Sequence, residues 1–170
     1  MFIPVADSAR SDDECLAFLA AQGFGHLIAP GRGREFPVVV PTQYVVDGDS
    51  IVLHLARPNP VWSALDENPV AVLSVAGDWA YIPGDWKAIG DEDPGAGIPT
   101  TYYAAVQAFC DATIVDEPTK LLDVLRTQLA SLEPALPDPA QHLSRLPGIR
   151  GLVLRPRELR EKFKYGGNVD

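Results

Sequence analysis

The sequence predicts a mainly β fold, a small antiparallel barrel with two or three helices packed outside it. About six or seven segments carry strand patterns, and most of them follow one another through hairpin turns. Helical patterns do not alternate regularly with these strands, which disfavours a doubly wound parallel sheet. A length of 170 residues suits a single domain, residues 1–170, with a sizeable core.

The first helix is predicted from the signals at its two ends. Ser11 and Glu14 form a capping box, with the serine at the N-cap and the glutamate three residues later. Gly23 follows the last residue at helical spacing and is typical of the position just after a helix. Residues 24–29 are then a short strand candidate, before a turn over residues 30–34.

The next strands are predicted from apolar runs and from turn residues. Residues 36–46 form one long apolar run, and its two prolines indicate an edge position or a bulge. Asp47-Gly48 is typical of a tight hairpin, here leading into a strand over residues 50–56. The nearly continuous apolar run over residues 69–75 predicts a fully buried strand.

The middle of the chain changes character after this strand. Residues 77–87 gather two tryptophans and a tyrosine, and a loop rich in Gly, Asp and Pro follows over residues 90–99. A loop of this length inside a compact domain is usually functional or mobile. Residues 100–115 carry β-branched and aromatic residues throughout, so they predict one long strand.

The C-terminal third predicts a helix and a closing strand. Asp116 is placed to cap a helix over residues 117–132, and a stripe of apolar residues on this helix is expected in the core: Leu121, Leu122, Leu125 and Leu129. A short helix over residues 141–146 and a closing strand over residues 149–154 follow. A basic tail follows, Lys162-Phe163-Lys164-Tyr165-Gly166-Gly167, for which no helix or strand is predicted.

The charge balance excludes one class of partner. The sequence has 23 acidic and 14 basic residues and a formal net charge of −9. Such a surface repels a polyanion, and no Lys/Arg stripe is present that could follow a phosphate backbone. Direct nucleic-acid binding is therefore disfavoured, whereas a small ligand held by a few local cations remains compatible.

No targeting segment and no metal site is predicted. The N-terminus lacks the features of a signal peptide and no apolar run approaches a membrane span, so we expect a cytoplasmic protein without membrane contact. Cys15 and Cys110 lie far apart in the sequence and are expected as reduced thiols. The three histidines, His26, His54 and His142, fall on different elements without metal-ligand spacing.

The most informative stretch is His54-Leu55-Ala56-Arg57-Pro58-Asn59-Pro60-Val61-Trp62, where a strand ends and a short helix over residues 61–65 begins. Exposed backbone N–H groups at a helix start, beside an arginine, are a usual way to hold a phosphate. The alternative is a capped turn whose geometry the two prolines impose and in which the arginine covers a surface. The residues alone leave both interpretations open.

A second candidate region opens the strand over residues 100–115. Side-chain alternation places Thr101 and Tyr103 on one face of this strand and their two neighbours on the other. Hydroxyls and aromatic rings at a barrel rim can hold a planar heterocycle by stacking and edge hydrogen bonds. Equally, tyrosines at a strand start are often core rings with a hydrated hydroxyl. Lys162 and Lys164 either reach a phosphate or carboxylate, or belong to a solvated tail.

Short motifs along the chain match one known family in order and spacing: Met1-Phe2-Ile3-Pro4, His54-Leu55-Ala56-Arg57 with Asn59-Pro60 and Trp62, Tyr81-Ile82 with Trp86, Pro99-Thr100 with Tyr103, Ala105 and Val106, and finally Lys162, Lys164 and Asn168. With these residues the chain resembles the PaiB-like FMN-binding negative transcriptional regulators, which belong to the FMN-binding split-barrel superfamily. The resemblance covers nearly the whole chain.

The resemblance implies a Greek-key split barrel that forms homodimers, with cofactor pockets at the subunit interface. FMN is the implied cofactor, with its phosphate at the end of the strand that carries Arg57 and its isoalloxazine framed by the aromatic-rich segments. An oxidoreductase activity at the flavin is then implied, with Tyr102 or Tyr103 as candidate proton donors. The candidate cofactor-binding residues are His54, Arg57, Asn59, Trp86, Lys87, Thr100, Thr101, Tyr102, Tyr103, Gln107, Lys162 and Lys164.

The chain departs from the family pattern inside the implied pocket. The family element Pro-Thr-Trp-Asn-Tyr-x-x-Val-His corresponds to residues 99–107 of this chain. At the positions where the family has Trp, Asn and His, this chain has Thr101, Tyr102 and Gln107. The Ser-Pro-Ser-Trp-Tyr element is Pro83-Gly84-Asp85-Trp86-Lys87 here, and Lys-Trp-Lys-Leu-Ser-Gln is Lys162-Phe163-Lys164-Tyr165-Gly166-Gly167. The chain therefore resembles a divergent branch whose ligand is open.

Two alternatives to a flavoprotein follow from the same resemblance. Around Gln107 and Phe163 the chain also resembles piperazate synthases, relatives that use haem, and with haem b the natural axial ligand is His54. The family's name instead implies a transcriptional regulator. The acidic surface and the absence of a recognition-helix pattern favour a regulator that responds to a ligand without direct DNA contact.

Overall fold

The computed structural model describes residues 1–88, 90–91, 93–135 and 139–166, and the side chains of residues 139–142 are not among what it describes. Asn168, one of the residues behind the family resemblance, lies outside the described residues. The elements in chain order are η1 (Val5–Asp7), α1 (Asp12–Gln22), β1 (Phe24–Ala29), β2 (Val38–Gln43), β3 (Val45–Asp47), β4 (Ser50–Ala56), α2 (Val61–Glu67), β5 (Val70–Ile82), η2 (Gly84–Lys87), η3 (Pro94–Ala96), β6 (Thr100–Val115), α3 (Pro118–Leu132), η4 (Pro139–Gly148) and β7 (Ile149–Lys164).

All seven strands belong to one antiparallel sheet with the order β2-β1-β5-β6-β7-β4-β3. The two edge strands, β2 and β3, are separated in sequence only by Tyr44, so the sheet must curl until its edges come together. The Tyr44 ring is buried, its hydroxyl donates to the Leu19 carbonyl at 2.8 Å, and its N–H donates to the Gly23 carbonyl at 3.0 Å. The predicted mainly β split barrel is confirmed.

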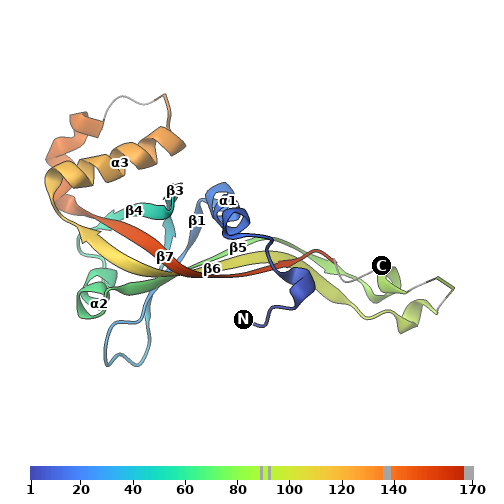
Figure 1. Cartoon of the computed structure of the whole chain (residues 1–170). Coiled ribbons are helices and arrows are strands. Elements are labelled where there is room, and N and C mark those ends of the chain that lie inside the picture. Colours follow the sequence, from blue (N-terminus) through green and yellow to red (C-terminus); the bar gives the residue numbers. More distant parts are fainter. Residues whose placement is uncertain (89, 92, 136–138, 167–170) are drawn as a thin grey trace.

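Three strands continue beyond the barrel body as a long projection (Figure 1). We call this projection the arm and define it as residues 77–88, 90–91, 93–104 and 161–164. Its strands stay paired as far as Ile82 with Thr100 and Tyr103 with Lys164. A register shift in the pairing of β5 between Ala76 and Trp79 marks the point where that strand leaves the body.

The core lies inside the curled sheet, where inward residues of β1, β4, β5, β6 and β7 pack against α1 and α2. A smaller cluster forms under α3 from Val115, Leu121, Val124 and Leu146. Figure 1 shows α3 lying across one end of the body, with the arm extending away from it. Among the described residues, no helix has the length and apolar character needed to cross a membrane.

Several local predictions are confirmed. The Ser11 hydroxyl accepts the Glu14 N–H at 3.3 Å, and Gly23 has the left-handed φ of 61° that ends α1. Gly48 supplies the positive φ of the turn between β3 and β4. The strands predicted over residues 24–29 and 100–115 have the bounds observed for β1 and β6.

Other predictions are corrected. The run over residues 36–46 is two edge strands rather than one, because the Tyr44 side chain enters the core and the chain changes edge there. The strand expected over residues 69–75 is the first half of the 13-residue β5, and its outward side chains are only partly buried. Residues 162–164 of the basic tail are not solvated coil but the last part of the 16-residue β7.

The predictions for α3 also need correction. Its N-cap is Glu117, whose carboxylate accepts the N–H groups of Thr119 and Lys120, because Asp116 is engaged by arginines instead. The leucine stripe is only partly buried, and the fully buried positions of this helix are Leu121, Val124 and Gln128. A buried amide among apolar residues needs a hydrogen-bond partner, and His54 supplies it for Gln128.

Candidate functional site

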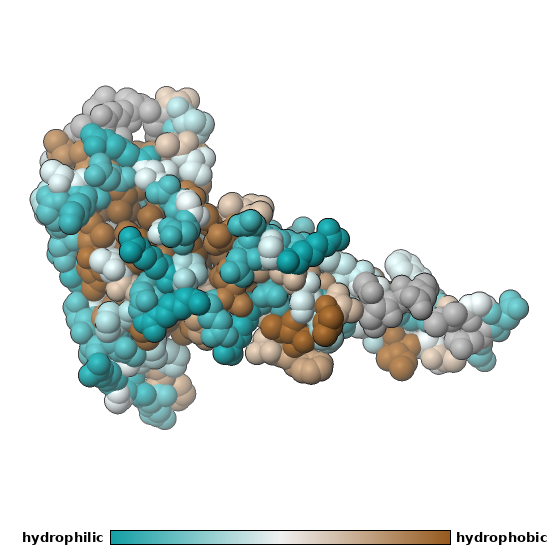
Figure 2. Space-filling model, in the orientation of Figure 1, coloured by the Kyte–Doolittle hydropathy of each residue, from teal (hydrophilic) through white to brown (hydrophobic). Residues whose placement is uncertain are grey.

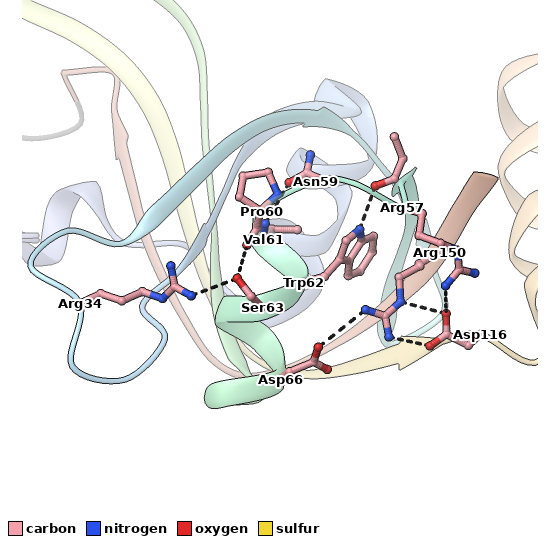
Figure 3. Close-up of polar contacts among 11 residues, drawn as sticks. Arg34, Arg57, Asn59, Pro60, Val61, Trp62, Ser63, Asp66, Asp116 and Arg150 are labelled. Atoms are coloured by element: carbon pink, nitrogen blue, oxygen red, sulfur yellow. Dashed lines mark hydrogen bonds and ion pairs between the residues drawn. The ribbon is translucent and has the colours of Figure 1, made fainter. Parts of the chain in front are cut away.

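The predicted phosphate motif forms a turn that is closed by its own hydrogen bonds (Figure 3). The Asn59 side-chain oxygen accepts the Val61 N–H at 3.0 Å, and the Asn59 carbonyl accepts the Trp62 N–H at 3.3 Å. The buried Trp62 indole donates to the Ala56 carbonyl at 2.9 Å. The N–H groups of Val61 and Trp62 at the start of α2 are therefore already bonded, as in the capped-turn alternative.

Arg57 fastens this turn to the start of β7. Its Nε donates to the Pro147 carbonyl at 2.8 Å, and its Nη2 donates to the Ile149 carbonyl at 3.0 Å. Its Nη1 lies 3.3 Å from a carboxylate oxygen of Asp116. A guanidinium has five N–H donors, so two of them remain for an anion beside these three contacts. The phosphate role of Arg57 stays a prediction.

The carboxylate beside Arg57 is shared with a second arginine. Arg150 holds Asp116 through two hydrogen bonds of 2.8 and 2.6 Å, reaches toward Asp66 at 3.8 Å, and lies over the Trp62 ring. These hydrogen bonds, aided by the charges of both arginines, lower the pKa of Asp116. The negative charge persists in mildly acidic solution and offsets part of the positive charge that Arg57 offers to a ligand.

His54 lies under α3 rather than at the mouth of this turn. Its Nδ1 is 2.6 Å from the side-chain oxygen of Gln128, the buried amide of α3. Both side chains line a cavity of about 420 Å³ between α3 and the sheet. The sequence did not single out Gln128, although a polar residue inside a leucine-rich helical stripe was the available signal.

The other predicted residues gather on the arm. The Lys87 ammonium lies 3.4 Å from the Tyr102 hydroxyl and 5.9 Å from the centre of its ring. The Lys164 ammonium donates to the Thr100 hydroxyl at 2.5 Å. Trp86 is 73% exposed at the turn beside them. Two cations, two hydroxyls and exposed aromatic surface are thus brought together on one projection.

The remaining predicted residues lie along the same strands. Tyr103 is paired with Trp79 on one side and Lys164 on the other, whereas Gln107 lies farther toward the body, opposite Ser74 and Arg160. Thr101 is opposite Tyr81. These pairings place Tyr103 on the arm, where the alternation of β6 directs its side chain to the face opposite that of Thr100 and Tyr102, while Gln107 marks the border between arm and barrel.

Lys162 is held by the N-terminal segment, which sequence reasoning did not connect with the site. Its ammonium donates to the Phe2 carbonyl at 3.1 Å and lies 3.6 Å from the carboxylate of Asp7. The Asp7 and Lys162 side chains are only 6% and 12% exposed. No spacing rule links residue 7 to residue 162, so the pair is a consequence of the tertiary fold alone.

The candidate residues therefore fall into two groups that do not meet within one copy. Ala56, next to Arg57, pairs with Ile149 at the start of β7, whereas Lys164 ends that strand. The 16 residues of β7 extend over about 50 Å at the usual rise of a strand. His54, Arg57 and Asn59 thus belong to the body, and the rest to the arm and its border.

Comparison with known proteins identifies the family. Residues 1–153 match the family model described as "Putative FMN-binding domain". The chain belongs to this family. The PaiB-like regulators predicted from the sequence are a narrower group than this FMN-binding domain family, and the match does not distinguish them. No curated protein matches the chain in sequence.

Solved structures share the fold at low sequence identity. A conserved hypothetical protein from Mycobacterium tuberculosis has a TM-score of 0.71 at 15% identity, covering 100% of this chain and 94% of its own. The FAD and heme binding protein from Mycobacterium smegmatis has a TM-score of 0.71 at 16% identity, with coverages of 93% and 73%. The heme storage protein HutZ from Vibrio cholerae has a TM-score of 0.58 at 14% identity, with coverages of 91% and 96%.

Proposed function

We propose that this member of the FMN-binding domain family is a homodimeric flavoprotein in which the arm of one copy completes the cofactor pocket on the body of the other. The observation that carries the proposal is the division of the candidate residues between two ends of one copy. A single pocket can contain Arg57 and Lys164 together only if two copies contribute to it.

The side chains of the arm suit the chemical parts of FMN. Ammonium groups such as Lys87 and Lys164 are ordinary phosphate ligands, and exposed aromatic rings offer stacking surface to a planar ring system. The hydroxyls of Thr100 and Tyr102 are already oriented by these lysines and can bond polar atoms of the ligand. FMN, when bound, supplies hydride and electron transfer, and the protein supplies position and charge.

The arm also carries the surface expected of an interface between copies. Trp79, Tyr81, Trp86 and Ile98 are all exposed by 60% or more. Figure 2 shows hydrophobic surface along the projection, away from the main body. Exposed aromatic surface of this extent is typical of a protein interaction site, and a second copy is the occupant that would also complete the pocket.

The first test is the absorption spectrum of the purified protein before and after FMN is added. Retention of a flavin band after gel filtration supports the proposal, and an FMN-free eluate argues against it. Anaerobic bleaching of the bound flavin by NADH or NADPH would then establish an oxidoreductase activity. An unbleached flavin would remove the enzymatic part and leave FMN binding intact.

The shared pocket has a sharper test, based on mixing two variants. Asn59→Asp keeps the side-chain oxygen that caps α2 but places a negative charge on the body side of the pocket. Lys164→Glu places a negative charge on the arm side. Each variant alone should bind FMN about tenfold or more weakly, because charge-assisted hydrogen bonds contribute roughly 1.5–3 kcal/mol. The matched control is Lys120→Glu, the same substitution on α3.

Refolding the two variants together should restore tight binding in about a quarter of the pockets, because a mixed dimer has one intact pocket and one doubly altered pocket. Recovery of that fraction supports a pocket shared between copies. Two variants that bind weakly alone and show no recovery after mixing contradict the shared pocket, while FMN binding by the wild type still stands.

The same spectrum tests haem. A Soret band that persists through gel filtration and is lost in His54→Ala would identify a haem protein with His54 as the ligand. The ring of His54 is already oriented by Gln128, as metal-binding histidines usually are by a second residue. A protein that takes up FMN and shows no Soret band after haemin addition excludes this alternative.

A further inference from the structure

The cavity under α3 is separate from the arm and has the character of a small-molecule site. It occupies about 420 Å³, within the range of ligand pockets in proteins. Leu125, Leu129 and Leu132 of α3 form its apolar wall, and the sheet supplies the opposite side. In Figure 2 hydrophobic surface is visible in the recess between the α3 region and the body.

One polar pair interrupts the apolar wall. Gln128 is only 5% exposed and bonds the His54 ring through its side-chain oxygen, so Nδ1 of the imidazole is the donor. The ring Nε2 is then an acceptor, and the Gln128 amide nitrogen is a donor. Neither side chain makes another side-chain hydrogen bond in the described part of the chain. The pair therefore offers one acceptor and one donor to a ligand beside the leucines of α3, in a cavity that Gln43 also lines.

The end of α3 makes the mouth of the cavity negative. Glu133, at the C-cap, is one of the lining residues, and none of the described residues that line the cavity is Lys or Arg. The last turn of α3 carries no basic side chain to neutralise the negative end of the helix dipole. A cation at the mouth would therefore be favoured by a carboxylate and by the free carbonyl groups of the helix end.

We infer that this cavity binds a small aromatic amine. The ring lies between the leucines, a hydroxyl or ring N–H donates to His54 Nε2, and the ammonium group lies at Glu133. The inference goes beyond the proposed flavin site, whose body side rests on Arg57 and Asn59, because the cavity is lined by neither of these residues and by no arm residue, and its His54 is bonded to Gln128 of α3. FMN binding and amine binding are therefore expected to be independent of each other.

Tyramine is the probe, because it carries a phenol hydroxyl at one end and an ammonium group at the other. Calorimetric titration of the full chain should give one site per copy with a dissociation constant of about a millimolar or tighter, as expected for ten heavy atoms. Glu133→Gln should weaken binding about threefold. Asp123→Asn, which removes an equal charge from the same helix away from the cavity, should leave the constant unchanged.

Further probes separate the polar contacts. Gln128→Leu, verified as folded by its thermal melt, should abolish the preference for tyramine over phenethylamine, which lacks the hydroxyl. 4-Ethylphenol, which lacks the ammonium group, should bind wild type and Glu133→Gln equally. Absence of tyramine binding, equal effects of the Glu133 and Asp123 substitutions, or displacement of tyramine by haemin with a Soret band would each overturn the inference. Each result is read without FMN, so it leaves the flavin proposal untouched.

Discussion

Cys15 and Cys110 are free thiols inside the main core, as the sequence predicted. Burial raises the pKa of each to about 12, and for Cys15 the carboxylate of Glu161 adds to the effect. The thiolate is the reactive form, so both groups should react with Ellman's reagent at pH 8 far more slowly than free cysteine. In guanidinium chloride, where the protein is unfolded, two thiols per chain should react with the reagent immediately. A fast reaction of the folded protein would contradict this packing.

Asp116 makes stability depend on pH in the acid range. Its pKa is lowered in the folded state below the ordinary value of 3.8, chiefly by the hydrogen bonds from Arg150. The stabilisation is therefore fully present only well above the ordinary value and is lost as the pH falls through the folded pKa. Urea unfolding should show that the free energy of unfolding falls less between pH 7 and pH 3 for Asp116→Asn than for wild type. The exposed Asp85→Asn is the control, and equal losses in all three would contradict the prediction.

At the scale of elements, α1 depends on its N-cap. The Ser11 hydroxyl accepts the Glu14 N–H, and the Glu14 carboxylate in turn accepts the Arg10 N–H at 2.7 Å. Ser11→Ala leaves a helix-end donor without its protein partner and should lower the free energy of unfolding by about 1 kcal/mol. The exposed Ser131→Ala should change it by less than about 0.5 kcal/mol. Chemical denaturation measures both.

Elements with clear end signals were predictable, and elements without them were not. The bounds of β6 follow from the proline before Thr100 and the acidic pair after Val115, and α1 follows from Ser11 and Gly23. The extension of β5 past Gly77 was missed because a bulge interrupts the alternation there. The outer part of β7 was missed because the arm buries neither face enough to impose an apolar pattern.

The candidate site was predictable as residue types but not as an arrangement. Tyr102, Lys87 and Lys164 were singled out separately, and only the arm brings them together. The pairs His54–Gln128 and Lys162–Asp7 connect distant parts of the sequence through the sheet, and no local pattern encodes such contacts. Arg57 was predicted as a phosphate ligand, with a surface-covering role as the alternative, and the structure engages three of its donors within the chain.

At the scale of the whole molecule, the proposed dimer makes the arm the part of the chain that we expect to decide the association state. Trp79→Asp places a charge on its exposed aromatic surface and, under the proposed dimer, should shift the protein toward monomer in sedimentation velocity. Phe36→Asp is the matched control, because Phe36 is 73% exposed and Trp79 71%, but Phe36 lies in the turn before β2. Dimers that persist equally in both variants would contradict an interface on the arm.

The sheet order also has a consequence for how the chain becomes folded. β7, the last strand in sequence, occupies an interior place between β6 and β4, and Ile51 pairs with Leu154 near the opposite end of the chain. The hairpin of β3 and β4 therefore has no strand beside β4 to join until β7 has been synthesised. Such distant pairings are slow to form, so the nascent barrel remains open to chaperones and proteases until β7 has emerged.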